Sequence, residues 1–336
     1  MKTFSIIIPV YNGRMVIGKA LDSIYSQGLA DEQFEVICVD DCSPTMETYD
    51  TLNNYTYNGK HPTNLKVLRH DENKRQGGAR NTAFHHAEGM WILYLDQDDS
   101  FVESSLLKLL NSLNECTICD IVMFDYCLIN TSRGKSITLH HIYANQGFSS
   151  SILQGTDFFL KYPIPYTPWC YAYKKAFLMQ HQIQFEEKVR FEDVDYAIKS
   201  TLNAEYMTFI PIDVYQHIES GDNTSFVGNN RNLVEDLFKI SIRIKKVSED
   251  ILPIQEKAGV AAMHHHIFHY HWLLSKILWR LSYCEIIDLL GRYIPYEKSN
   301  NRLIDFTLKH PRVYAALAQV ARPFLLAAIW MRNKFK

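Results

Sequence analysis

The sequence contains little that would support several common classes of protein. Its 336 residues include 35 Lys or Arg and 37 Asp or Glu, and this near balance gives no support for nucleic-acid binding. Seven cysteines are scattered along the chain, and the single Cys-x-x-Cys, at 116–119, has no second pair to complete a zinc site. The apolar run at 4–10 is too short for a secretory signal. We therefore expect a cytoplasmic protein with reduced thiols.

Strand and helix patterns alternate through the first 100 residues. Short apolar runs predict strands at 4–8, 36–39, 65–68 and 91–95, and apolar residues at helical spacing predict helices at 16–25 and 79–87. This alternation indicates an α/β fold with a mostly parallel sheet and helices on both faces. Ligands are then expected beyond the carboxyl ends of the strands.

An acidic cluster follows the last of these strands. Residues 96–99 have the sequence Asp-Gln-Asp-Asp, and Asp40 and Asp41 follow the strand at 36–39 in the same way. Carboxylates this close repel one another unless a cation lies among them, and Mg²⁺ and Mn²⁺ commonly share such carboxylates with substrate phosphates. A solvated acidic loop is the alternative. Because both pairs lie at the same edge of the sheet, we expect a metal and diphosphate site there.

Four segments carry a family resemblance. In order they are 4–12 (Phe-Ser-Ile-Ile-Ile-Pro-Val-Tyr-Asn), 39–43 (Val-Asp-Asp-Cys-Ser), 77–81 (Gly-Gly-Ala-Arg-Asn) and 94–99 (Tyr-Leu-Asp-Gln-Asp-Asp). Together they resemble the inverting glycosyltransferases of family 2, which have a GT-A type, Rossmann-like fold. The resemblance covers roughly residues 1–225 and predicts a GT-A domain there, followed by a helical region at 226–336.

The resemblance implies an activity and its partners. It implies metal-dependent transfer of a sugar, with inversion, from a nucleotide-diphosphate donor to a hydroxyl of a glycan or lipid-linked acceptor, in surface polysaccharide biosynthesis. A UDP-sugar is the favoured donor. The alternatives are a binding or scaffold protein that keeps the fold without turnover, and a sugar-phosphate nucleotidyltransferase. The latter needs a glycine-rich phosphate loop after the first strand, where residues 9–12 are Pro-Val-Tyr-Asn.

The resemblance also assigns residues to the donor and the metal. Arg80 is expected at the diphosphate or the base pocket, with an ion pair to an acidic loop as the alternative. His217 is expected near the metal, with a buried structural histidine as the alternative. The predicted nucleotide-sugar site comprises Pro9, Val10, Tyr11, Asn12, Asp40, Asp41, Arg80, Asp96 and Gln97. The predicted ligands of Mn²⁺ or Mg²⁺ are Asp98, Asp99 and His217.

A general base is expected outside these segments, on the opposite face of the donor sugar. Glu192 and Asp193 precede an apolar pattern that predicts a helix, and the resemblance favours Asp193 as the base. Two acids that only cap the helix are the alternative. Trp169 and Tyr171 are predicted as an aromatic wall for the acceptor sugar, with core packing as the competing role.

The last hundred residues change in character. No acid follows Asp305, whereas basic residues continue to the end of the sequence, and 313–331 is apolar apart from a central Arg-Pro interruption. A charged, kinked centre argues against a membrane span. We expect a peripheral contact with an anionic membrane, on the inner face of the cell membrane, or else helices packed on the protein or in a homodimer. The histidines at 264–271 are expected in an aromatic-rich helix rather than in a metal site.

Overall fold

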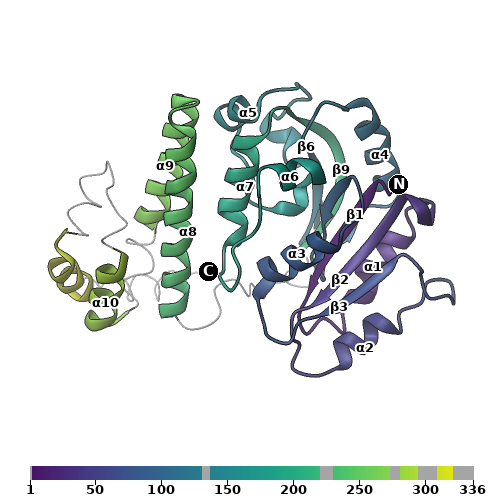
Figure 1. Cartoon of the computed structure of the whole chain (residues 1–336), viewed down its shortest axis with the longest axis horizontal. Coiled ribbons are helices and arrows are strands. Elements are labelled where there is room, and N and C mark those ends of the chain that lie inside the picture. Colours follow the sequence, from purple (N-terminus) through teal and green to yellow (C-terminus); the bar gives the residue numbers. More distant parts are fainter. Residues whose placement is uncertain (1, 131–136, 220–229, 273–280, 294–308, 321–336) are drawn as a thin grey trace. The chain divides into compact units, whose positions relative to one another are not determined.

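The computed structural model describes residues 2–130, 137–219, 230–272, 281–293 and 309–320. Contacts divide the chain into two compact units, Met1–Asn223 and Thr224–Lys336. Figure 1 shows the chain in sequence colours, with the strands in its purple to teal part.

The first unit is built on one sheet. Its strands are β1 Phe4–Val10, β2 Phe34–Asp40, β3 Leu65–Arg69, β4 Trp91–Tyr94, β5 Ser100–Phe101, β6 Ile121–Asn130, β7 Ile137–Leu139, β8 Tyr171–Lys174 and β9 Met207–Glu219. Its helices are α1 Ile17–Tyr25, α2 Glu47–Asn53, α3 Arg75–His86, α4 Ser105–Glu115, α5 Gly155–Lys161, α6 Lys175–Gln180 and α7 Glu192–Asn203. Short 3₁₀ turns lie at Asp31–Gln33, Ala144–Gln146 and Pro168–Cys170.

The strand order is β3-β2-β1-β4-β8-β6-β9-β5, with β7 paired to β6. Neighbours from β3 to β4 are parallel, as the alternating pattern predicts. Beyond β4 the sheet is mixed, because β8 pairs antiparallel with both β4 and β6 while β6 and β9 are parallel. The local alternation of strand and helix predicts the parallel part of the sheet, from β3 to β4. The position of β8 between β4 and β6 depends instead on pairing between segments that are distant in the sequence.

Burial patterns explain these elements. Every residue of β1 and β2 is buried, which fits central strands covered on both faces. In α1 the buried residues are Ile17, Ala20, Leu21 and Ile24, a spacing that places them on one face of the helix. Helix α3 packs on β1 and β2, α1 on β5, and α4 on β9. Right-handed crossovers place α1 and α3 on opposite faces of the sheet, so loops from both faces meet at its carboxyl edge.

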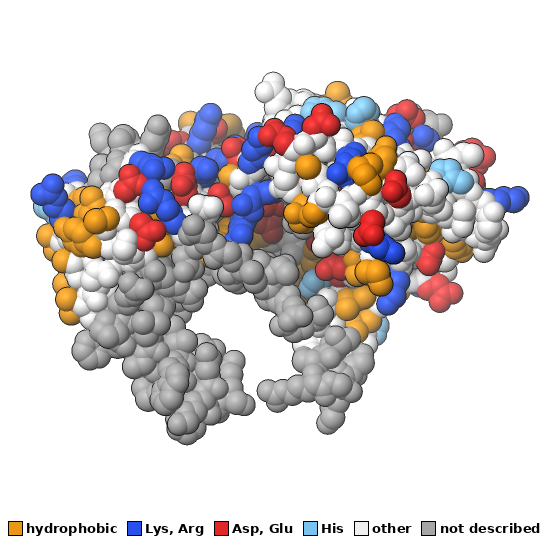
Figure 2. Space-filling view, turned by 90° about the horizontal axis from the view of Figure 1, so that it is seen from below, with side chains coloured by type: hydrophobic (Ala, Val, Ile, Leu, Met, Phe, Trp, Pro, Cys, Tyr) orange, Lys and Arg blue, Asp and Glu red, His pale blue; other side chains and the backbone are white. Residues whose placement is uncertain are grey.

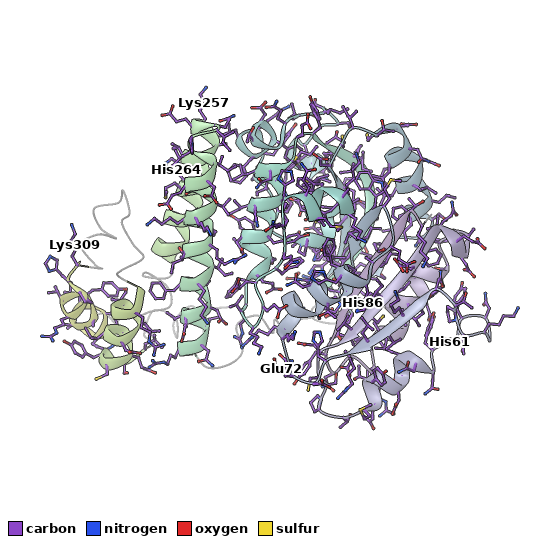
Figure 3. The ribbon with its side chains drawn as sticks, in the orientation of Figure 1. His61, Glu72, His86, Lys257, His264 and Lys309 are labelled. Carbon is purple, nitrogen blue, oxygen red and sulfur yellow. The ribbon has the colours of Figure 1, made fainter. Side chains whose placement is uncertain are left out.

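The second unit is helical in its described part. Helix α8 Asn230–Ile251 packs against α9 Glu256–Trp272, and α10 Tyr283–Tyr293 follows. The histidine segment 264–271 lies within α9, where His264 is exposed and the other side chains are outside the described residues (Figure 3). No helix in the described ranges is long and apolar enough to cross a membrane. Figure 2 shows charges of both signs interspersed over the described part of one face of the molecule.

Candidate functional site

Asp99 anchors the acidic loop to β9. Its carboxylate is 3% exposed. One oxygen accepts a hydrogen bond from the Ile218 N–H at 2.8 Å, and the other accepts one from the Tyr215 hydroxyl at 2.7 Å and lies 3.0 Å from His217 Nδ1. The Tyr215 hydroxyl also accepts a hydrogen bond from the Asp96 N–H at 3.1 Å. Both oxygens of Asp99 therefore have partners within the protein. These contacts anchor the loop, and they compete with the predicted role of Asp99 in metal binding.

Asp98 and His217 form the pair best suited to a cation. Asp98 is exposed and borders a cavity of about 460 Å³. Partial burial, followed by the neighbouring carboxylates of Asp99 and Asp96, raises the pKa of Asp98, which a bound cation would reverse. The Asp99 contact uses Nδ1 of His217 and raises the pKa of that ring, leaving Nε2 as its ligand atom. An imidazole beside a carboxylate fits Mn²⁺ better than Mg²⁺, which prefers oxygen ligands.

The end of β1 is tied to the acidic loop by one side chain. Gln97 Oε1 accepts a hydrogen bond from the Tyr11 N–H at 2.9 Å, and Gln97 Nε2 donates to the Tyr11 carbonyl at 3.1 Å. A Cβ at Gly13 would lie 2.4 Å from Gln97 Oε1, so a larger residue there would displace the Gln97 side chain from these hydrogen bonds. The Tyr11 side chain is 48% exposed, whereas Pro9 and Val10 are buried in the strand. Among these predicted base contacts, Tyr11 is the one with a ring face open for stacking.

Asp40 organises the neighbouring loop from inside the protein. It is fully buried; one oxygen accepts hydrogen bonds from the Ser43 N–H, at 3.1 Å, and from the Ser43 hydroxyl, while the other forms an ion pair with Arg69. The Ser43 hydroxyl oxygen accepts a hydrogen bond from the Asn12 N–H at 2.8 Å. Both oxygens of Asp40 therefore have partners within the fold, and its place in the nucleotide-sugar site stays a prediction.

Asp41 fixes the next turn. One carboxylate oxygen lies 2.7 Å from His70 Nδ1 and accepts a hydrogen bond from the Lys74 N–H at 2.8 Å. Cys42 follows with a φ of 58°, a left-handed conformation that costs a non-glycine residue strain. The chain therefore adopts this turn without the glycine that the conformation favours.

Arg80 lies between the donor loop and the predicted base. Its guanidinium is 2% exposed and forms ion pairs with Asp96 at 2.9 Å and Glu192 at 3.0 Å. Its Cζ lies 5.2 Å from the centre of the Phe185 ring. These two ion pairs are the alternative role named for Arg80, and its contact with the donor stays a prediction. Arg80 thereby couples the loop after β4 to the start of α7.

The rest of the Gly-Gly-Ala-Arg-Asn segment supports the same connection. The Asn81 side chain donates to the Phe185 carbonyl at 2.9 Å and accepts from the Phe185 N–H at 3.0 Å. A Cβ at Gly77 would lie 2.4 Å from the Glu186 carbonyl and 3.0 Å from Cγ of Glu192. This motif therefore docks the chain segment that leads into α7, a role that its sequence does not reveal.

Glu192 and Asp193 begin α7, after Phe191 in a left-handed conformation. Glu192 is buried against Arg80, whereas Asp193 is less buried. Burial, with the adjacent Glu192 carboxylate as the next cause, raises the pKa of Asp193 to about 7. A carboxyl group that titrates near neutral pH is well matched to general-base catalysis. The different exposure of Glu192 and Asp193 is consistent with separate roles for the two acids.

The predicted acceptor wall is corrected to core packing. Trp169 is 6% exposed and Tyr171 is 1% exposed, and the Tyr171 hydroxyl donates to the Pro165 carbonyl at 2.8 Å. The Trp169 ring stacks on Tyr215 at 4.2 Å and on His217 at 5.5 Å. Trp169 therefore supports the His217 ring by stacking on it. Neither Trp169 nor Tyr171 has a ring face exposed for a sugar.

Comparison with known proteins identifies the family of the chain. The model of the family described as "Glycosyl transferase family 2" matches residues 5–179. The chain belongs to glycosyl transferase family 2. The chain is 40% identical over 112 residues to the poly(ribitol-phosphate) beta-glucosyltransferase of Bacillus spizizenii, covering 33% of this chain and 17% of that protein. It is 26% identical over 219 residues to the poly(ribitol-phosphate) beta-N-acetylglucosaminyltransferase TarS of Staphylococcus aureus, covering 65% of this chain and 35% of TarS.

The fold of this family 2 member is shared with solved structures. S. aureus TarS 1–349 in complex with UDP-GlcNAc matches with a TM-score of 0.66 and 21% identity, covering 95% of this chain and 89% of that one. At this identity the likeness establishes the GT-A fold and no more. The chain spans only about a third of TarS, the curated relative that it matches over 219 residues.

Proposed function

We propose that the chain transfers a sugar from a UDP-sugar to a hydroxyl of a cell-surface polymer, with inversion at the anomeric carbon. The observation that carries this is that Asp193, with its pKa raised to about 7, follows Glu192, which Arg80 joins to Asp96 of the acidic loop. The UDP-GlcNAc complex of a protein with the same fold supports the donor class. The names of the relatives support polyol-phosphate or lipid-linked glycan acceptors.

In this proposal each part of the site has one task. The exposed ring of Tyr11 stacks on the base. Asp98 and His217 hold Mn²⁺ or Mg²⁺, which when bound neutralises charge on the departing diphosphate. Asp193 takes the proton of the acceptor hydroxyl as that oxygen attacks the anomeric carbon from the opposite side. Arg80 positions both sides of the reaction, because it is paired to Asp96 and to Glu192.

A donor and acceptor screen tests the proposal. UDP-glucose and UDP-GlcNAc are each offered with poly(ribitol phosphate) or with an undecaprenyl-diphosphate-linked sugar, and the glycosylated acceptor is measured. We expect one donor and acceptor pair to give product together with stoichiometric UDP. Absence of product with all combinations, with or without Mn²⁺, would contradict a UDP-sugar donor or these acceptor classes.

We also propose that the helical segment 311–320 contributes to peripheral membrane binding. Val313, Leu317 and Val320 are 48%, 60% and 68% exposed and share one helix face. Lys309 and Arg312 are exposed beside this face, and Figure 3 shows Lys309 pointing away from the ribbon. The basic residues beyond 320 lie outside the described residues. An apolar stripe beside basic side chains is the pattern of a helix that lies on an anionic lipid surface.

Leu317→Glu should therefore weaken sedimentation with phosphatidylglycerol vesicles, and the remaining binding should fall as salt increases. Met179→Glu is the matched control, because Met179 is 58% exposed on α6 in the first unit and should not affect binding. Equal vesicle binding by the wild type and Leu317→Glu would assign the stripe to a contact with protein, such as a second copy of the chain.

A further inference from the structure

A second group of metal-ligating side chains lies away from the acidic loop. Strands β6 and β9 change register on both sides of Asp125, because Phe124 pairs with Ile210, Asp125 with Asp213 and Tyr126 with Tyr215. The first of these shifts concerns this cluster. The two extra residues of β9, one of them Pro211, form a bulge, and bulges commonly re-aim a side chain. As a result, two carboxylates that are 88 positions apart in the sequence lie side by side. The segment after β7 adds His140 and His141 to this cluster.

Asp213 contacts both histidines, and Asp125 lies close to Asp213 and His141. Asp213 has one oxygen 2.7 Å from His140 Nδ1, and the other accepts a hydrogen bond from the His141 N–H at 3.0 Å and lies 3.4 Å from His141 Nδ1. Asp125 is fully buried. One of its oxygens accepts hydrogen bonds from the Tyr126 N–H at 3.0 Å and the Tyr143 N–H at 2.9 Å, and the other accepts one from the Ala144 N–H at 2.9 Å. These three N–H groups stabilise the charged form of the carboxylate, which is the form that binds a metal. Ligand atoms of Asp125, His141 and Asp213 all lie within 4.8 Å of one another.

The cluster contains two carboxylates and no Lys or Arg partner among the described residues. The side chain of Asp125 is fully buried and that of Asp213 is 10% exposed, so neither carboxylate is well hydrated. In the described part of the chain, no Lys or Arg forms an ion pair with either of them. Adjacent buried carboxylates are costly unless a cation or a proton lies between them. The positive charges within reach are those of His140 and His141 when protonated, or a metal ion.

We propose that Asp125, His141 and Asp213 bind a divalent transition metal ion of the Zn²⁺ class. Two carboxylate oxygens and one imidazole nitrogen match a three-ligand zinc site with an open fourth position, and the imidazole disfavours Mg²⁺ and Ca²⁺. His141 is 52% exposed and leaves a path from solvent. His140 holds Asp213 from the other side, as partners of metal ligands commonly do.

A metal here would support the candidate active site through packed rings. It would fix the segment 140–146 to β6 and β9, because one ligand comes from each. Tyr143, in that segment, packs on Tyr126 at 5.3 Å, and Tyr126 packs edge-on against Trp169 at 5.0 Å. Trp169 in turn stacks on His217. The ion is therefore a stabilising element, and its binding does not depend on the proposed sugar transfer.

Zinc titration tests the inference without any activity assay. The full chain, without an affinity tag, is titrated with Zn²⁺ by calorimetry and with Co²⁺ by visible absorption. The Asp98→Ala background removes the predicted loop site. We expect a single equivalent of Zn²⁺ to bind in that background and Co²⁺ to give the absorption of a low-coordinate site. His141→Asn should abolish this binding, and Asn tolerates the φ of 52° at this position.

Two further variants sharpen the result. His140→Asn should weaken Zn²⁺ binding by roughly 10- to 100-fold, the usual effect of losing a partner of a ligand. His86→Asn is the matched control, because His86 is an exposed histidine on α3, labelled in Figure 3, and should leave binding unchanged. The inference is overturned if Zn²⁺ does not bind in the Asp98→Ala background, or if it binds equally well after His141→Asn, as binding to the α9 histidines would.

Discussion

Asp98→Ala should abolish sugar transfer and leave the thermal unfolding temperature close to that of the wild type. Asp98 is exposed and borders the open cavity, so its loss removes no packing. In the proposed mechanism a cation held by Asp98 would offset charge on the diphosphate, and losing such stabilisation costs about 10² or more in turnover. The measurement is UDP release and product formation at saturating donor and Mn²⁺, with EDTA treatment of the wild type as the equivalent chemical removal.

Asp99→Ala is the matched control for this prediction. Its carboxylate is buried and accepts hydrogen bonds from Tyr215 and from the Ile218 backbone, so its loss leaves partners unsatisfied. Each unsatisfied buried group costs about 1–3 kcal/mol, and this variant should unfold at a clearly lower temperature. Full activity of Asp98→Ala, or of the wild type in EDTA, would disprove the assignment of the metal to Asp98.

Asp193→Asn should keep donor binding and lose transfer by about 10² to 10⁴, because the amide cannot accept the proton of the acceptor hydroxyl. With the pKa of Asp193 raised to about 7, kcat/KM of the wild type should rise with pH through about 7, whereas an ordinary aspartate would already be ionised near pH 4. Donor binding is measured by calorimetry with the UDP-sugar, and transfer by single-turnover product formation.

Asp193→Asn should lower activity but raise the stability of the folded protein. The folded pKa of Asp193 lies above its unfolded value, so ionising this carboxyl disfavours the folded state as pH rises from about 4 to about 7. Asp193→Asn should therefore unfold at a higher temperature than the wild type at pH 8, and the difference should shrink at pH 4. Most active sites that hold a strained charge show this trade of stability for function.

Glu192→Gln separates the two acids. It removes the ion pair with Arg80 and should lower the unfolding temperature, while retaining more transfer activity than Asp193→Asn. If Glu192→Gln eliminates transfer and Asp193→Asn does not, the pair is right and the choice between its acids is wrong.

Local patterns in the sequence were sufficient for the first half of the sheet. The strands at 4–8, 36–39, 65–68 and 91–95 appear as β1 to β4, and the predicted helix after Glu192 is α7. Strands of this kind are continuous apolar runs and helices have a 3.6-residue spacing, so each is encoded by adjacent residues. The family resemblance was equally local, since its motifs lie within about 100 residues, and the family model confirms it.

The functions of individual side chains were less predictable, because they depend on distant partners. Asp40 and Asp99 stand at strand ends, as a ligand-binding carboxylate would, but Arg69 and Tyr215 occupy their oxygens. Arg80 meets Glu192 only because Gly77 allows α3 to approach the segment before α7.

The cluster of Asp125, His141 and Asp213 gave no signal in the sequence. Its members are separated by 16 and 72 positions and meet through the bulge in β9. Spacing rules for metal sites detect ligands on one helix or one loop, and they do not detect a set that a sheet brings together.

The configuration of the transferred sugar tests the central claim most directly. With the active pair of donor and acceptor, and a donor whose sugar is α-linked to UDP, the anomeric proton of the product is examined by NMR before any secondary reaction. Asp193 acting as a single base, with no second carboxylate serving as nucleophile, predicts a β-linked product. An α-linked product would require a covalent intermediate or front-face attack, and would contradict the assignment of Asp193 as the base of an inverting transfer.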